Sequence, residues 1–334
     1  MGTTMNDVAK EAGVSVATVS KYINGGNVLD RNEKAIQAAI DLLDYEINQI
    51  ARGLKTNSTK TVGVLIPSFK NIFFTTIISD IEEKLRQEGY SIIVCDYRED
   101  SDLEKEKLKF LLNKRVDGII MVPTSNDIDH IKNIYEKKIP IVLIDRMIDG
   151  LECDVVAVDN INASYNSVEE LIKNGHQRIG IICGPKDIYT TNDRLKGYYR
   201  VMEDYNIDIK KEMIQFSDYK IEGGYDSFNK LMNLNNPPTA IFVTNYEMTL
   251  GSVIAINENN INIPTDLSII GFDNIQLAKI VNPSLSIVVQ PMNEIGDKVA
   301  EIILKRLKGD CSDFPEIYRL KTELLIKESV SCLN

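Results

Sequence analysis

The chain has few of the residues that metal, disulfide and hydrolytic chemistry require. Its 334 residues include no Trp, two His and five Cys, and no two Cys form a CxxC pair. An odd number of scattered cysteines excludes a disulfide framework and a zinc site, and is typical of free thiols in a reducing compartment. We therefore expect no bound metal and no cofactor.

Long apolar runs are also missing. No uninterrupted stretch approaches the roughly 18 residues that a membrane helix needs, so we expect no membrane partner. Residues 1–10 are polar and lack the apolar core of a secretory signal peptide. These absences predict a cytoplasmic protein.

Basic residues are fewer than acidic ones, which argues against nucleic-acid binding by charge alone. Lys and Arg number 38 against 49 Asp and Glu, for a net charge of −11. The imbalance is uneven, because residues 1–60 hold seven basic and seven acidic side chains and are neutral. Residues 47–60 hold Arg52, Lys55 and Lys60 and no acid. An acidic body that follows a neutral head with a short basic stretch is the asymmetry that the function must explain.

Short helices are the only structure predicted for the first 45 residues. Helices are expected over 7–12, 16–23 and 31–44, since Gly13 ends the first and Ser15 offers an N-cap hydroxyl to the second. Two helices joined by a tight turn with Gly form the helix-turn-helix pattern, although any small helical hairpin shows the same spacing. In a major groove, hydroxyl side chains would contact phosphates and other exposed side chains would contact base edges. The candidates are Ser15, Thr18 and Ser20 for phosphates, and Val16, Ala17 and Lys21 for bases.

From residue 61 the pattern changes to alternating strands and helices. Strands that are apolar on both faces and separated by amphipathic stretches indicate parallel sheets covered by helices. The predicted fold class is α/β, with a small all-α helix-turn-helix head and a two-lobed body of doubly wound parallel sheets that divides near residues 159–160. A helix is expected over 77–87, and strands at 62–66, 91–94, 118–122, 139–144, 155–158, 178–182, 240–243 and 267–270.

Polar and aromatic side chains lie at or beside the ends of several expected strands. Ligands of open α/β sheets bind at the carboxyl ends of the strands, although any one such residue is more often a helix cap or part of an ion pair. The residues in question are Asn71, Phe73, Phe74, Asp145, Arg146, Arg194, Asn245, Asp273 and Gln290.

Seven segments carry a family resemblance: residues 6–20, 51–54, 62–67, 115–120, 175–179, 271–274 and 290–291, in order along nearly the whole chain. In these segments the chain resembles the LacI/GalR family of bacterial transcriptional regulators. The resemblance implies a helix-turn-helix DNA-binding head over 1–46, a hinge helix and linker over 47–60, and a periplasmic-binding-protein-like body over 61–334. It places lobe one at about 61–159 plus 291–320, and lobe two at about 160–290 plus 321–334.

The same resemblance implies partners. It implies a homodimer on a pseudo-palindromic double-stranded DNA operator, controlled by a small effector that we expect to be a sugar or a related metabolite. The nine strand-end residues resemble the effector contacts of the family, which offer polar groups to hydroxyls and an aromatic face to a sugar ring.

A hinge helix at about 48–54 is implied as well, with DNA contacts from Asn48, Arg52, Leu54 and Lys55. Seven residues are too few for an isolated helix, which needs roughly 12–15, so we expect this segment to fold against its dimer mate and DNA. Leu54 would enter a step of the minor groove as an apolar wedge. The alternative is that Leu54 packs the linker onto the body.

Three positions depart from the family pattern. Residues 45–48 lack the Pro that often precedes the hinge, which leaves the entry to the hinge looser. Lys21 replaces a common Arg and cannot form the planar bidentate fork of a guanidinium. Tyr246 stands where the family often has Asp, so no particular sugar is assigned.

Three other functions fit parts of the sequence. A sugar-binding transport receptor resembles the body, but the head and the missing signal peptide count against it. An enzyme is the second alternative. We expect the protein to have no enzymatic activity and no catalytic residues, because the chain lacks a GxGxxG motif after a strand, a Walker lysine, an HExxH motif and a GxSxG motif. Control by a protein corepressor, as in the catabolite-control branch, stays an alternative, since residues 277–283 and 288–291 resemble that branch as well as other members.

Overall fold

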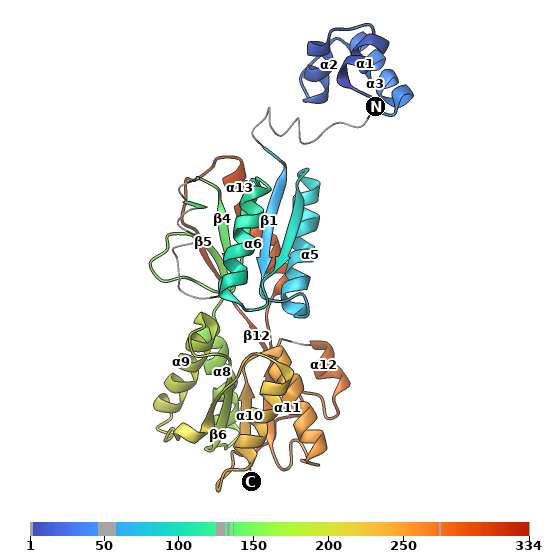
Figure 1. Ribbon diagram of the computed structural model, residues 1–334. Helices are drawn as coiled ribbons and strands as arrows, with labels where there is room; N and C mark the ends of the chain where they lie inside the picture. Colours follow the sequence, from blue (N-terminus) through green and yellow to red (C-terminus); the bar gives the residue numbers. More distant parts are fainter. Residues whose placement is uncertain are drawn as a thin grey trace. The chain divides into compact units, whose positions relative to one another are not determined.

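The computed structural model describes residues 3–45, 58–124, 131, 134–135, 137–273 and 275–333. The chain divides into two compact units, Met1–Thr59 and Lys60–Asn334, and Figure 1 shows the elements of each. None of the helices in the described ranges is both long enough and apolar enough to cross a membrane.

The described part of the N-terminal unit consists of helices α1 (Met5–Glu11), α2 (Val16–Ile23) and α3 (Asp30–Leu43). Helix α1 begins two residues earlier than predicted, because Thr4 and Asp7 form a capping box. Helix α2 has the predicted bounds, with Ser15 as its N-cap, and Gly13 adopts the positive φ of 64° that the turn before it requires. The buried core of the unit consists of Val8, Ala9, Val19, Ile36 and Ala39.

Lobe one of the C-terminal unit is built on a sheet of order β11-β5-β4-β3-β1-β2, in which every neighbouring pair is parallel. Helices α5 (Ile72–Gln87) and α13 (Met292–Leu307) pack on one face, and α6 (Ser101–Asn113) packs on the other. Both faces are covered, which explains the apolar central strands. The strands are β1 (Thr61–Ile66), β2 (Ser91–Asp96), β3 (Gly118–Met121), β4 (Ile141–Ile144), β5 (Asp154–Val158) and β11 (Ile317–Leu320).

Lobe two has a sheet of order β12-β10-β9-β8-β6-β7. Helices α8 (Asn160–Lys173) and α9 (Tyr189–Asp204) cover one face, and α10 (Ile221–Met232) and α11 (Tyr246–Glu258) cover the other. A 3-10 turn η1 (Lys211–Met213) precedes β7, and α12 (Ile275–Ile280) follows β9. The strands are β6 (Ile179–Cys183), β7 (Ile214–Phe216), β8 (Ala240–Val243), β9 (Ser268–Phe272), β10 (Ser286–Val289) and β12 (Glu323–Leu325).

The predicted fold class is confirmed, with three differences in detail. The expected strands appear within two residues of their predicted ends, but β7, β10, β11 and β12 were not predicted. β7, β11 and β12 are edge strands whose side chains are mostly half-buried or exposed, so they form no buried apolar run. β12 pairs with β10 in antiparallel orientation, where parallel sheets were expected. Helix α5 begins at Ile72 rather than at residue 77, because the Asn71 side chain accepts a hydrogen bond from the Phe73 N–H at 3.0 Å and caps the helix.

The chain passes between the lobes three times, from β5 to α8, from β10 to α13 and from β11 to β12. Consequently each lobe contains segments that are distant in the sequence. The carboxyl ends of both sheets face the junction, so residues that follow the strands of either lobe are brought toward the same region.

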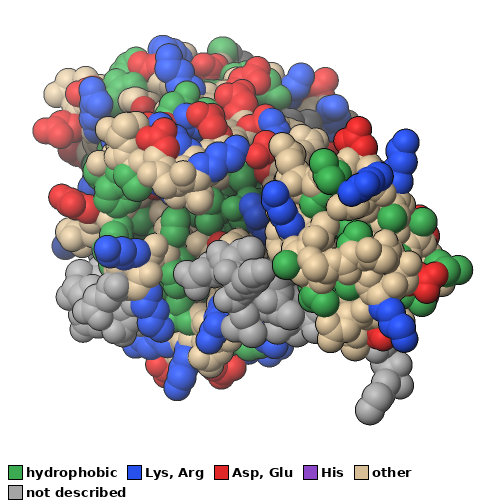
Figure 2. Space-filling view, turned by 90° about the horizontal axis from the view of Figure 1, so that it is seen from above, with side chains coloured by type: hydrophobic (Ala, Val, Ile, Leu, Met, Phe, Trp, Pro, Cys, Tyr) green, Lys and Arg blue, Asp and Glu red, His purple; other side chains and the backbone are tan. Residues whose placement is uncertain are grey.

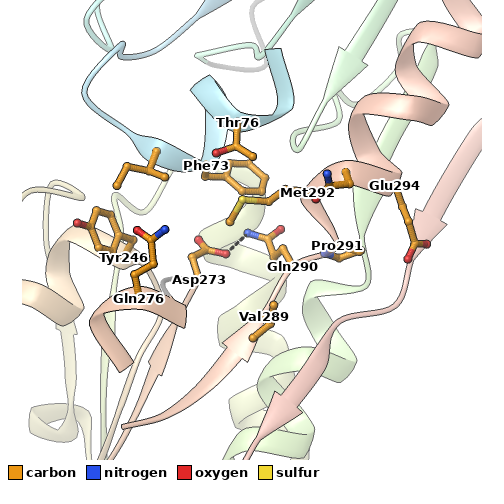
Figure 3. Close-up of a pocket in the computed structure, with 12 residues that line it drawn as sticks. Phe73, Thr76, Tyr246, Asp273, Gln276, Val289, Gln290, Pro291, Met292 and Glu294 are labelled. Atoms are coloured by element: carbon orange, nitrogen blue, oxygen red, sulfur yellow. Dashed lines mark hydrogen bonds between the residues drawn. The ribbon is translucent and has the colours of Figure 1, made fainter. Parts of the chain in front are cut away.

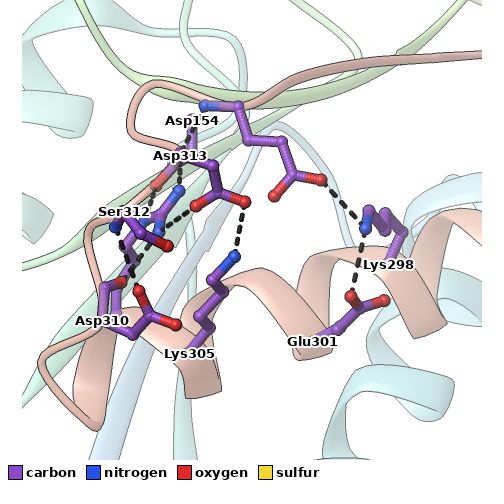
Figure 4. A network of polar contacts seen from close by, with 9 residues as sticks. Asp154, Lys298, Glu301, Lys305, Asp310, Ser312 and Asp313 are labelled. Atoms are coloured by element: carbon purple, nitrogen blue, oxygen red, sulfur yellow. Dashed lines mark hydrogen bonds and ion pairs between the residues drawn. The ribbon is translucent and has the colours of Figure 1, made fainter.

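A buried ion pair anchors the last segment of lobe one (Figure 4). Arg306 of α13 donates from Nε and Nη2 to the two carboxylate oxygens of Asp154, at 2.8 and 2.9 Å. Its Nη1 donates to Asp313 at 2.8 Å, and the Glu316 N–H donates to Asp154 at 2.8 Å. Since Asp313 and Glu316 lie just before β11, this network holds the returning chain against the edge of β5.

Candidate functional site

The N-terminal unit presents the predicted DNA-contacting residues on α2. Ser15, Val16, Ala17 and Lys21 are exposed, and Thr18 and Ser20 are half-buried. The Ser15 and Thr18 hydroxyls lie 2.8 Å apart, and Ser15 also accepts a hydrogen bond from the Thr18 N–H at 3.1 Å. The Ser15 hydroxyl therefore caps the helix and is paired with the Thr18 hydroxyl, and the exposed surface of α2 is formed by small and apolar side chains with one Lys.

The remaining predicted DNA contacts, Asn48, Arg52, Leu54 and Lys55, lie outside the described residues. Among the described residues on the face seen in Figure 2, Lys and Arg side chains are mixed with acidic and apolar ones.

All nine strand-end residues predicted from the sequence line one recess between the lobes, which has a volume of about 40 Å³. Lobe one contributes the start of α5 and the residues after β4, and lobe two contributes α9 and the residues after β8, β9 and β10. Glu99, Thr190 and Tyr219 also line the recess and were missed. Glu99, Thr190 and Tyr219 also come after strands, namely β2, β6 and β7 in that order. Of these strands, β7 was not predicted.

Two carboxylates face the recess from corresponding positions of the two sheets. Asp145 follows β4 and Asp273 follows β9, and both are buried. Burial raises the pKa of Asp273 to about 6, while Arg194 and the hydrogen bond from Gln290 act in the opposite direction. Burial likewise raises the pKa of Asp145, against the opposing charges of Arg194 and Arg146. Both carboxylates are thus poorly solvated acceptors.

The two arginines of the recess are held by different partners. Arg146 forms a bidentate pair with Glu99, at 3.0 and 3.2 Å, and donates to the Pro123 carbonyl at 3.1 Å. Arg194 donates from Nε to Asn160 at 2.8 Å, donates to the Thr244 carbonyl, and lies 4.0 Å from the ring centroid of Phe272. Both guanidinium groups are therefore fixed in position before any ligand arrives.

Asn71 and Asn245 act as helix caps, which is the ordinary role of such residues. Asn71 caps α5, and Asn245 accepts a hydrogen bond from the Met248 N–H at 2.9 Å to cap α11. Phe73 and Phe74 pack edge to face with ring centroids 5.0 Å apart. Tyr219 is fixed through its hydroxyl, which lies 2.6 Å from the Thr191 hydroxyl. These contacts fix the positions of these side chains in the walls of the recess.

A larger cavity adjoins the recess (Figure 3). This outer chamber has a volume of about 490 Å³ and shares Phe73, Asp273 and Gln290 with the recess. Gln290 donates from Nε2 to Asp273 at 2.6 Å, so the pair forms part of the boundary between the two spaces. Tyr246 lines the outer chamber and not the recess. The lining of the outer chamber consists of Ile72, Phe73, Thr76, Tyr246, Asp273, Gln276, Val289, Gln290, Pro291, Met292, Asn293 and Glu294.

Comparisons with known proteins agree with both units. The model of bacterial regulatory proteins of the lacI family matches residues 4–48, and the model of periplasmic binding proteins and the sugar binding domain of the LacI family matches residues 59–321. The HTH-type transcriptional repressor PurR of Actinobacillus pleuropneumoniae serotype 3 (strain JL03) is 33% identical over 99% of each chain. Catabolite control protein A of Priestia megaterium is 34% identical over 94% of this chain and 95% of that protein. The solved complex of the transcriptional regulator CelR with cellobiose is 25% identical, with a TM-score of 0.75 over 98% of this chain and 99% of that one.

The chain therefore belongs to the lacI family of bacterial regulatory proteins and is a DNA-binding transcriptional regulator. Proteins of this family bind operator DNA as dimers and respond to small effectors. The resemblance seen in the sequence is confirmed.

Proposed function

We propose that this regulator binds a pseudo-palindromic operator as a homodimer and that an uncharged, hydroxylated small molecule in the recess controls its affinity for DNA. The DNA contacts come from the head, residues 1–46, and from the hinge and linker, residues 47–60, and the effector binds the body, residues 61–334. The protein acts in the cytoplasm, where its operator lies, and performs no catalysis.

The observation that carries the proposal is the convergence of side chains from both lobes on one buried recess. Asp145 and Asp273 accept hydrogen bonds from hydroxyl groups, and Arg146 and Arg194 donate to hydroxyl oxygens. Three carboxylates, counting Glu99, face these two guanidinium groups, so the recess disfavours a phosphorylated or carboxylated ligand. The cellobiose complex of the related CelR regulator supports a carbohydrate.

Control of DNA affinity follows from the construction of the recess. A ligand that contacts both lobes favours the arrangement of the lobes in which all its contacts are made, and it shifts the population by its difference in affinity for the two arrangements. Because the head precedes lobe one in the chain, a change in lobe arrangement in each protomer of a dimer alters the spacing of the two hinge segments.

The test begins with selection of an operator from random DNA by the purified protein. Operator affinity is then measured by fluorescence anisotropy with and without a panel of neutral sugars and their phosphate esters, in the absence of any other protein. We expect a neutral sugar to change operator affinity and its phosphate ester to have no effect. Stronger effects of the phosphate esters, or an effect only when a corepressor protein is added, would contradict the proposal.

A matched pair of variants tests whether the effector binds in the recess. Asp145→Asn removes a buried carboxylate of the recess and keeps its shape, whereas Asp226→Asn removes an exposed carboxylate of α10. We expect Asp145→Asn to abolish the response to the effector while affinity for DNA without effector is retained, and Asp226→Asn to behave as the parent protein does.

The role of the hinge is tested separately by Leu54→Ala. Insertion of an apolar side chain at a base step offsets the few kcal/mol that unstacking costs and permits a bent duplex. We expect the variant to bind the selected operator more weakly and to bend it less in gel-mobility assays. Non-specific binding, which depends on phosphate contacts, should keep its affinity and its salt dependence. Unchanged bending at unchanged affinity would assign Leu54 to packing of the linker.

A further inference from the structure

The C-terminal end of helix α2 is closed by a Schellman motif. Gly25 has a positive φ of 73° and its N–H donates to the Tyr22 carbonyl at 2.9 Å, while the Gly26 N–H donates to the Lys21 carbonyl at 2.9 Å. The chain therefore turns back directly after the helix. This turn brings the backbone of Gly26 against the last turn of α2, which carries Lys21.

Gly26 leaves the space in which the Lys21 side chain lies. A Cβ atom at residue 26 would lie 2.7 Å from Lys21 Cγ and 3.3 Å from Lys21 Cε, and the first distance is far shorter than the roughly 3.5–4.0 Å of a carbon–carbon contact. In a Schellman motif this position frequently carries a hydrophobic side chain that packs on the helix. Here it has none, and the Lys21 stem lies across bare backbone. Gly26 is half-buried, whereas Asn24, Gly25 and Asn27 are exposed.

Helix α2 is held in one orientation about its axis. The Tyr22 hydroxyl donates to Gln37 Oε1 of α3 at 2.9 Å, and Gln37 donates from Nε2 to Asp41 at 2.8 Å. Val19, also on α2, is buried in the core of the head. With the helix fixed, the direction of the Lys21 ammonium depends on its flexible four-carbon stem, and the contact with Gly26 restricts that stem.

We propose that Gly26 is a positioning residue for DNA recognition, which acts through Lys21. Because residue 26 has no side chain, the Lys21 stem is held against the backbone, and its ammonium donates to O6 or N7 of a guanine in the major groove. A stem that is already ordered loses less conformational entropy when it contacts DNA. This inference rests on the proposed function, in which the head contacts the operator, and adds the residue that determines how Lys21 reaches it.

A double-mutant cycle on the full-length protein tests this inference. Fluorescence anisotropy measures the affinity of Lys21→Ala, Gly26→Ala and the double variant for the operator that the parent protein selects. We expect Lys21→Ala to weaken binding roughly tenfold and Gly26→Ala to weaken it about fivefold or more, the scale of a base contact. In the Lys21→Ala background, Gly26→Ala should change affinity by less than about twofold, because the group through which it acts is gone.

Base selection separates this role from a structural one. Selection from random DNA with Lys21→Ala and with Gly26→Ala should return half-sites that lose their preference for guanine at the same position. Gly25→Ala is the control, since its Cβ would meet no atom within 4 Å but its positive φ strains an alanine. This variant should unfold at a lower temperature in scanning calorimetry and return the half-site of the parent protein.

A third measurement does not depend on a substitution at residue 26. In the operator complex of protein labelled in lysine and glycine, nuclear Overhauser effects should connect the Cγ and Cε protons of Lys21 with the Cα protons of Gly26. Their absence would show that the stem leaves Gly26 when DNA binds, and would overturn the inference even where Gly26→Ala fails to fold.

The outcomes separate this inference from the proposed function. An equal loss from Gly26→Ala in both backgrounds, or a half-site that it leaves unchanged, shows that Gly26 supports the fold and does not position Lys21. If Lys21→Ala leaves affinity and half-site unchanged, Lys21 reads no base and the inference fails, while control of operator binding by an effector stands. If the parent protein selects no operator, the proposed function fails and this inference with it.

Discussion

Asp145 and Asp273 occupy equivalent positions in the two lobes. Each directly follows a buried strand, with φ of 67° and 75°, and each donates its N–H to a carbonyl of the next strand, Val156 at 2.9 Å and Val288 at 2.7 Å. Asp tolerates the left-handed conformation better than most residues, but that conformation still costs roughly 1–2 kcal/mol. Backbone strain of this kind is concentrated at functional sites, and here it occurs in both walls of the recess.

The raised pKa of Asp273 predicts how effector binding depends on pH. In the proposed complex an effector hydroxyl donates to the ionised carboxylate, which exists above the pKa of about 6. Affinity should therefore fall as the pH is lowered through 6, and protonation of Asp145, whose pKa is also raised, adds to the loss. Calorimetry between pH 5 and 8 measures this. A profile that is flat in the parent protein would remove Asp273 from the site.

The same carboxylate should lower the stability of the fold at neutral pH. Its pKa rises from 3.8 in the unfolded chain to about 6 in the folded one, so the folded chain binds the extra proton between these values. Stability therefore falls as the pH rises across this window, by up to about 3 kcal/mol. Asp273→Asn should be more stable than the parent protein at pH 7.5 and gain little at pH 4, as measured by urea unfolding. An equal change at both pH values would show that the carboxylate is not desolvated.

Arg194→Lys should weaken both the fold and effector binding. A Lys side chain lacks the planar fork that bonds Asn160 and the Thr244 carbonyl, and it stacks less well on Phe272. We expect a loss of about 1–3 kcal/mol in the free energy of unfolding, because buried acceptors lose their donors. Arg200→Lys on the exposed side of the same helix is the control and should stay within about 0.5 kcal/mol. Equal effects of the two substitutions would contradict this reading of Arg194.

The pair of Asp154 and Arg306 should dominate the stability of lobe one. Asp154→Asn leaves a buried guanidinium without its main partner, and breaking such a pair costs about 3 kcal/mol or more. The exposed pair of Glu88 and Lys308 provides a control, since Glu88→Gln should cost less than about 1 kcal/mol. Denaturant unfolding of both variants measures the difference, and similar losses would show that the network of Figure 4 contributes no more than a surface pair.

Ala17 on α2 should determine part of the operator sequence. It is exposed next to Val16, and a wrong base pair in a specific site costs about 1–3 kcal/mol. Selection from random DNA with Ala17→Gln should return a half-site that differs from that of the parent protein. Ala38→Gln, at an exposed position of α3, should return the original half-site. The same consensus for all three proteins would show that Ala17 does not contact bases.

Local features made much of this structure predictable. The bounds of α2 follow from Ser15 at its start and Asn24-Gly25-Gly26 at its end, because capping and chain breaking act within a few residues. The strands that are buried on both faces were visible as apolar runs for the same reason that they lie in the middle of covered sheets. Asp145 and Asp273 were identified as site residues because each follows such a run directly.

Long-range contacts decided the rest. The antiparallel pairing of β12 with β10 and the attachment of β11 to β5 join segments that lie far apart along the chain, and the edge strands β11 and β12, mostly exposed or half-buried, show no continuous apolar run. The sequence by itself determined the family, the two-lobed fold and the set of polar residues at the strand ends. Only the tertiary structure decided that Glu99 binds Arg146, that Tyr219 completes the recess, and that an apolar chamber lies beside it, because burial and cavity volume depend on how both lobes pack together.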